Sequence, residues 1–219
     1  MPFMTVIRQT RACVAGLAIL ATAPLPAHAQ TNRPPTPAPQ IEKYAATTVN
    51  MNPGAGEPLS IRVSRWSTDA ERERLTVLFA EKGEQELKTA LAAAPTLGYI
   101  WTSETLGYSL RYAYRLPTPD GGERIILATD HRLGAWSREA WKASAAGAPD
   151  YEFTVLELRL TRRGTGEGKI SLGAKVAVDQ ESKTIALENY NAAPILLKDV
   201  KREGPGRVQS AAPPGKGQK

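Results

Sequence analysis

The chain has very few residues of the types that supply thiol, imidazole or zinc chemistry. Its 219 residues include one cysteine, Cys13, and two histidines, His28 and His131. A disulfide needs two cysteines, and zinc sites normally combine several cysteine or histidine ligands. The composition therefore excludes an intrachain disulfide and disfavours a zinc site, and we expect neither a metal nor another cofactor.

The sequence also lacks an apolar run long enough to span a bilayer, which takes about 20 residues. The longest candidate, residues 12–23, follows two arginines and precedes Ala27-His28-Ala29, and residues 1–29 contain no acid. A basic start, a short apolar core and a small-x-small site are the three parts of a secretory signal. We expect cleavage near Ala29 and a periplasmic or secreted protein without a transmembrane segment.

Three further segments follow the predicted signal. Residues 30–40 contain four prolines and predict an extended spacer. Residues 41–202 form the predicted single domain. Residues 203–219 are rich in glycine, proline and alanine and predict a disordered basic tail.

The positive charge of the chain lies mainly at its two ends. The net charge is +6, but residues 1–29 carry two arginines without an acid, and residues 201–219 carry five basic residues against Glu203. Residues 30–200 are therefore balanced in charge. A nucleic-acid-binding domain concentrates basic residues on a folded face, so nucleic acid is not an expected partner.

Alternating apolar and polar residues predict a mostly β domain between short turns. The predicted strands are residues 43–51, 59–66, 98–103, 108–116, 123–129, 151–160, 169–178, 184–190 and 195–200. Thr68 and Glu71 fit a capping box, Gly83 interrupts the helical pattern and Pro95 follows it, which predicts helices near 68–82 and 84–94. A helical turn is also expected within residues 136–141. The fold class is α+β, mostly β: an antiparallel meander of about nine strands, open or barrel-like, with a helix pair after the second strand.

The glycine-rich segment at residues 164–169 does not fit a phosphate-binding loop. Arg163 stands where the first glycine should be, and Ile170 follows Lys169 in place of serine or threonine. The segment instead predicts a hairpin turn.

Few residues could support a hydrolase. His131 would be the general base of any serine–histidine relay in the mature chain, but the sequence has no G-x-S-x-G elbow. Paired carboxylates could act without histidine, and Glu152, Glu157 and Glu188 lie on predicted strands. Charges on the solvated face of a sheet explain these three residues more simply, so we predict no catalytic residues.

Aromatic residues cluster on neighbouring predicted segments. The candidates for binding a carbohydrate or an apolar ligand are Trp66, Tyr99, Trp101, Tyr108, Tyr112 and Tyr114. Strict alternation would place Tyr108, Leu110, Tyr112, Tyr114 and Leu116 on one face. Large aromatic side chains also fill β cores, and that role is the more common one.

Residues 60–202 resemble a family of uncharacterised exported bacterial proteins. The resemblance is carried by residues 65–72, 97–100, 106–108, 119–125, 128–130, 157–160, 166–169 and 187–190. It implies an export signal and a shared single domain. It implies no activity and no catalytic residues.

These observations favour a non-enzymatic β domain of the cell envelope that binds a small ligand or an envelope protein. Two alternatives stay open. One is a cofactor-free envelope hydrolase that uses carboxylates, and the other is a structural or assembly protein that pairs through edge strands. The sequence does not indicate the oligomeric state.

Overall fold

The computed structural model describes residues 41–53, 55–102, 107–143 and 149–204. The predicted signal segment, the predicted spacer and the predicted tail beyond residue 204 lie outside these ranges. Within them the chain is mostly antiparallel β with two helices, as predicted. The elements are β1 (Glu42–Thr48), β2 (Met51–Asn52), β3 (Pro58–Val63), α1 (Asp69–Lys82), α2 (Glu84–Ala93), β4 (Gly98–Thr102), β5 (Tyr108–Pro117), β6 (Glu123–Thr129), β7 (Lys142–Ala143), β8 (Thr154–Leu160), β9 (Thr165–Ile170), β10 (Val176–Asp179), β11 (Thr184–Leu187) and β12 (Leu197–Glu203).

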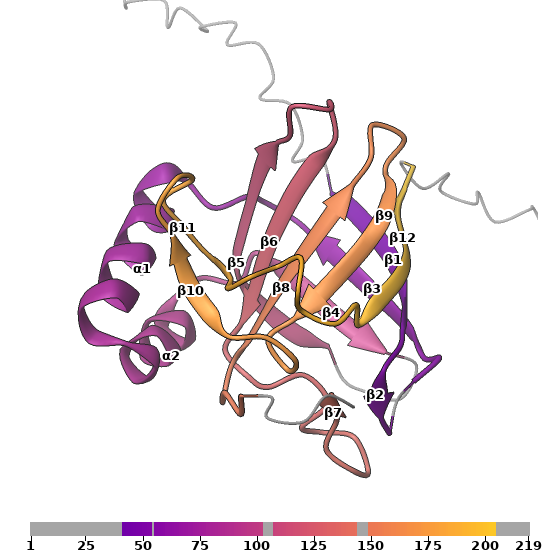
Figure 1. Cartoon of the computed structure of the whole chain (residues 1–219). Helices are drawn as coiled ribbons and strands as arrows, with labels where there is room; N and C mark the ends of the chain where they lie inside the picture. Colours follow the sequence, from indigo (N-terminus) through magenta and orange to yellow (C-terminus); the bar gives the residue numbers. More distant parts are fainter. Residues whose placement is uncertain (1–40, 54, 103–106, 144–148, 205–219) are drawn as a thin grey trace, which may run out of the picture. The chain divides into compact units, whose positions relative to one another are not determined.

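Eight of the strands form a closed antiparallel barrel in the order β1-β12-β9-β8-β6-β5-β4-β3 (Figure 1). Strand β1 pairs with β3 on one side and with β12 on the other, and this double pairing closes the sheet. The remaining strands form two small sheets, β10-β11 and β2-β7. Of the open and closed arrangements that the sequence allowed, the structure has the closed one.

The interior of the barrel is filled by apolar side chains. In β3, alternate residues point inward, and Leu59, Ile61 and Val63 are each 1% exposed. A barrel of eight strands has an interior just wide enough for side chains to fill it. The inward-facing side chains therefore form the main core of the domain.

The helix pair forms as its local sequence predicts. The Thr68 hydroxyl accepts from the Glu71 amide, the Glu71 carboxylate accepts from the Thr68 amide, and Gly83 ends α1 with a φ of 80°. Leu75 of α1 and two leucines of α2 pack in a second apolar cluster on the outer side of the barrel. The helices thus cover part of the outer face together with the β10–β11 hairpin (Figure 1).

The predicted alternation along β5 is wrong, because this strand contains an irregularity. Its register against β6 shifts between Leu110 and Tyr112, as at a β-bulge. Tyr108 and Leu110 therefore belong to the interior cluster, whereas Tyr112 belongs to the outer cluster, with Tyr114 and Leu116 packed against it.

The predicted strand at residues 169–178 is in fact two strands in different sheets. Strand β9 ends at Ile170, a turn follows in which the Gly173 amide donates to the Ile170 carbonyl, and β10 begins at Val176. The hairpin turn predicted at 164–169 lies at its start, where Gly164 has a φ of 75°, and Gly166 and Gly168 lie within β9. Residues 136–141 form turns and bends rather than a helical turn.

The close packing of β3 against β4 can be tested by substituting Gly98 of β4. A Cβ at this position would lie 1.9 Å from the carbonyl oxygen of Arg62, whereas a Cβ at Gly107 would have no neighbour nearer than 3.6 Å. We expect Gly98→Ala to lower the free energy of unfolding by roughly 1–3 kcal/mol, measured by urea denaturation. Gly107→Ala is the matched control and should change it by less than about 0.5 kcal/mol. Equal effects of the two substitutions would contradict this packing.

Candidate binding surface

Apolar side chains pack against one another in the interior of the barrel. Leu133 and Trp141, from the segment between β6 and β8, are buried in the interior cluster. Elsewhere in the same cluster Tyr44 donates a hydrogen bond from its hydroxyl to Glu42 at 2.8 Å. A binding site must therefore be sought on the outside of the barrel or at its ends.

Three of the six predicted aromatic residues serve the core. Tyr108 points into the barrel and stacks on Trp136 with ring centroids 4.3 Å apart. Tyr112 is buried on the outer side and shares a hydrogen bond of 2.6 Å with Thr184 of β11. Tyr114 stacks beside Tyr112 and donates to Asp69 at 2.7 Å. These side chains hold elements of the domain together and do not form one platform.

Trp66 is also held by internal contacts. Its indole Nε1 donates to Glu42 at 3.0 Å, and the guanidinium of Arg115 lies 4.7 Å from the ring centroid. Arg115 in turn forms an ion pair with Glu42. The tryptophan is therefore part of a polar cluster and is separate from the remaining two candidates.

Tyr99 and Trp101 are the two predicted residues that the structure brings together on an open surface. Both lie on β4 and point outward, because Ile100 between them points into the barrel. Tyr99 is 46% exposed and Trp101 is half-buried. Residues two positions apart on a strand are separated by about 7 Å, so the two rings are neighbours on one face.

Strand pairing aligns these aromatic residues with charged residues in two rows across β12, β1, β3 and β4. One row consists of Glu203, Lys43, Arg62 and Tyr99, and the other consists of Lys201, Ala45, Ser60 and Trp101. Adjacent strands are about 4.8 Å apart, so each row extends roughly 15 Å across the barrel. We call these eight side chains the two-row surface.

A hollow lies between the two rows, beside Trp101. Its volume is about 200 Å³, and it is lined by Lys43, Tyr44, Ser60, Ile61, Arg62, Trp101 and Glu203. It is large enough for one small ring-shaped group rather than a drug-sized ligand.

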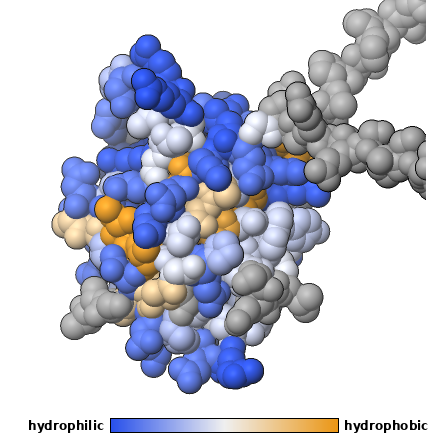
Figure 2. Space-filling view, turned by 90° about the vertical axis from the view of Figure 1, so that its right-hand side faces the viewer, coloured by the Kyte–Doolittle hydropathy of each residue, from blue (hydrophilic) through white to orange (hydrophobic). Residues whose placement is uncertain are grey.

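The two-row surface carries more positive than negative charge. Lys43, Arg62 and Lys201 face a single acid, Glu203, and all four are exposed. Across the described ranges these three cations form no ion pair. Figure 2, which looks onto the side where β9, β12 and β1 lie in Figure 1, shows a mostly hydrophilic surface with small separate apolar patches.

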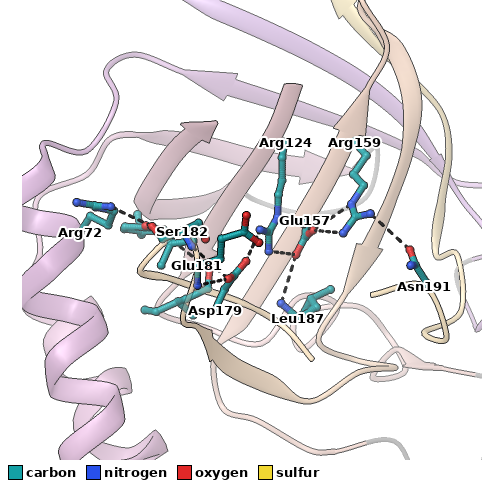
Figure 3. A network of polar contacts seen from close by, with 12 residues as sticks. Arg72, Arg124, Glu157, Arg159, Asp179, Glu181, Ser182, Leu187 and Asn191 are labelled. Carbon is teal, nitrogen blue, oxygen red and sulfur yellow. Dashed lines mark hydrogen bonds and ion pairs between the residues drawn. The ribbon is translucent and has the colours of Figure 1, made fainter. Parts of the chain in front are cut away.

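A buried network of charges lies on the other part of the outer face (Figure 3). Glu157 of β8 is 0% exposed, and its carboxylate accepts from Arg124 at 2.8 and 3.2 Å and from Arg159 at 3.2 and 3.3 Å. The Leu187 amide of β11 also donates to it, at 3.4 Å. Arg124 in addition donates to Asp179 at the end of β10. Because these contacts join β6 and β8 to the β10–β11 hairpin, the network fixes the hairpin on the barrel.

Asp179 is held in its charged form. Partial burial acts to raise the pKa of this carboxyl group, but hydrogen bonds from Arg124 and Ser182 outweigh burial and lower the pKa to about 2. An ion taken partly out of water is stable only when such partners replace its hydration. The network is therefore a structural element, and its contribution to the stability of the fold should depend on pH.

The carboxylates and the histidine considered for hydrolysis do not form a common site. Glu157 is saturated by guanidinium donors and shielded from solvent, so it is poorly suited to transfer a proton. Glu152 pairs with Lys88 of α2, and Glu188 is exposed after β11. His131 lies 3.0 Å from Asp130, but Asp130 also accepts from Arg111 at 2.9 Å.

The described ranges contain neither a cluster of metal ligands nor a membrane-spanning helix. No group of three or more histidine, cysteine, aspartate or glutamate side chains there could hold a metal ion. No helix there is long and apolar enough to cross a bilayer.

Comparison of the chain with models of protein families, with curated proteins and with solved structures found no match. The family resemblance of residues 60–202 therefore stays a prediction. The function must be inferred from the geometry of the chain itself.

Sequence reasoning missed the contribution of β1 and β12 to this surface. Lys43 and Glu203 are adjacent in space but lie at opposite ends of the domain. The alternation of residues 43–51 indicated that Lys43 and Ala45 share a face, but their partners depend on barrel closure. The sequence alone has no local signal for that pairing.

The charge network predicts a loss of stability in acid. The pKa of Asp179 is lower in the folded state than its ordinary value of 3.8, so its contribution is complete above that pH and is lost as the pH falls toward about 2. Asp179→Asn should lower the free energy of unfolding by on the order of 2 kcal/mol at neutral pH, measured by urea denaturation. It should also flatten the dependence of that free energy on pH between about 4 and 2.

Asp199→Asn is the control for this prediction. Asp199 is exposed and has a φ of 53°, a conformation that asparagine also tolerates. The Asp199→Asn variant should show the same dependence of the free energy of unfolding on pH as the wild type. An unchanged acid dependence in Asp179→Asn would contradict the role assigned to this carboxylate.

Proposed function

We propose that the protein is a non-enzymatic binding protein of the bacterial envelope that holds an anionic partner on its two-row surface. The observation that supports this most strongly is the alignment of Tyr99 and Trp101 with Lys43, Arg62 and Lys201, which form no ion pair in the part of the chain that the structure describes. Exposed aromatic residues beside positively charged side chains are typical of binding surfaces. The surface lies on strands of the barrel away from α1, α2 and the β10–β11 hairpin (Figure 1).

Charge complementarity supports an anionic partner. The two-row surface has an excess of positive charge, and residues 205–219 add Arg207, Lys216 and Lys219 without any acid. Complementary charge increases the rate of encounter and selects partners of opposite sign. The export signal, which stays a prediction, would place the surface among the polymers of the envelope.

The two alternatives have weaker support. A carboxylate hydrolase would need two carboxylates at a shared, accessible site, but Glu157 is buried and engaged by two arginines. Assembly through edge strands would need a free edge, but the main sheet is closed, and the remaining edges belong to the two small sheets, β10-β11 and β2-β7. The binding function requires neither feature.

Binding to isolated envelope material tests the proposal. The protein, expressed with its own first 40 residues and exported, is co-sedimented with cell envelopes. We expect the double variant Tyr99→Ala/Trp101→Ala and the variant Arg62→Glu each to bind at least about tenfold more weakly, because each removes a main contact. Binding by the wild type should also weaken with added salt.

Two substitutions on α1 serve as controls. Arg74 and Val77 are exposed on that helix, and Val77 is 46% exposed. Arg74→Glu matches the charge change of Arg62→Glu, and Val77→Ala removes an exposed apolar group elsewhere. Both should bind like the wild type. The proposal fails if the two-row variants are folded and sediment with envelopes as well as these controls do.

A further inference from the structure

The hollow on the two-row surface has walls of three different chemical kinds. Trp101 provides a flat aromatic wall, Lys43 and Arg62 provide positive charge, and Ser60 and Glu203 provide groups that accept hydrogen bonds. Tyr44 and Ile61 complete the lining of the hollow. A ligand there would meet all three kinds of group at once.

Each wall matches one part of an acidic sugar. The apolar face of a sugar ring packs on an aromatic ring such as that of Trp101. Its hydroxyl groups can donate to the Ser60 hydroxyl and the Glu203 carboxylate. Its carboxylate suits the planar fork of the Arg62 guanidinium, assisted by Lys43.

Tyr99 extends the site beyond one ring. It lies two residues from Trp101 on the same face of β4, about 7 Å away. Its register partner is Arg62, which also lines the hollow together with Trp101. A second ring of the same chain could therefore stack on Tyr99 while the first occupies the hollow.

Other anionic partners fit this surface less well. A lipid surface favours protruding apolar side chains, but the eight residues of the two-row surface include no large aliphatic residue, and Trp101 is half-buried. A folded acidic protein favours an apolar centre within about 800 Å² of contact. The hollow, of about 200 Å³, is too small to provide such a centre.

We infer that the hollow beside Trp101 is a subsite for one ring of an acidic saccharide, with Tyr99 holding a neighbouring ring. The inference rests on the proposed function and specifies its partner: a polymer of sugars that carry carboxylates. The sugar rings stack on Trp101 and Tyr99, and the sugar carboxylates bind to Arg62 and Lys43.

Calorimetric titration with defined ligands tests the inference. The probes are short oligomers of galacturonic and glucuronic acid, the same oligomers with their carboxyl groups reduced to alcohols, a glutamate-rich peptide, and vesicles of anionic phospholipid. We expect the acidic oligomers to bind and their reduced forms to bind at least about tenfold more weakly. The peptide and the vesicles should bind more weakly than the acidic oligomers.

Substitutions then locate the bound ring. Ser60→Leu fills the hollow without changing charge, and Trp101→Ala removes its aromatic wall, so each should reduce affinity for the acidic oligomers at least about tenfold. Arg62→Gln should reduce the preference for acidic over reduced oligomers. Arg74→Gln on α1 is the matched control and should leave both affinities unchanged.

The results separate this inference from the proposed function. If no acidic oligomer binds, but envelope binding still depends on Tyr99 and Trp101, the saccharide assignment is wrong and the binding function stands. Equal binding of acidic and reduced oligomers would also overturn it, as would tighter binding of the peptide or of the vesicles. If envelope binding is also insensitive to Tyr99 and Trp101, both proposals fail.

Discussion

The antiparallel pairing of β1 with both β12 and β3 is the constraint on which the rest of this structure depends. It joins the first and last strands of the domain and removes the free edges of the main sheet. It also fixes the register that places Lys43 between Glu203 and Arg62. A slip of one residue would turn Tyr44 outward and Lys43 into the apolar interior, so burial strongly specifies this register.

Closure divides the outer face of the barrel into two parts with different chemistry. On one part the helices and the β10–β11 hairpin cover apolar side chains, and Glu157 is neutralised by Arg124 and Arg159. On the other part Lys43, Arg62 and Lys201 are exposed and form no ion pair with any residue that the structure describes. These exposed cations are therefore available for another molecule.

The parts of the fold that were predicted correctly from the sequence depend on contacts between nearby residues. The helix limits follow from Thr68, Glu71 and Gly83, which act within a few positions of the chain. Strand β6 follows from the hairpin turn at residues 119–122, after which the chain returns as a partner strand. The two errors in the predicted strands have a common cause. The bulge after Leu110 and the end of β9 at Ile170 both depend on which cluster buries each side chain, and the local pattern of residues does not contain this information.

The candidate surface was predictable only in part. Its aromatic residues, Tyr99 and Trp101, were among six candidates, but their composition did not distinguish them from Tyr108 or Tyr112, which are buried. The deciding information is the register across four strands, and this register joins residues 43 and 203. No periodicity within a segment contains that information.

Amide hydrogen exchange of the exported protein, with and without envelope polymer, tests the location of the binding surface most directly. Binding at the two-row surface should slow exchange in β12, β1, β3 and β4, where the ligand would restrict local opening. Exchange in α1, α2 and the β10–β11 hairpin should stay unchanged. Slowing confined to the helices, or to residues 131–143, would place the partner elsewhere and contradict the account.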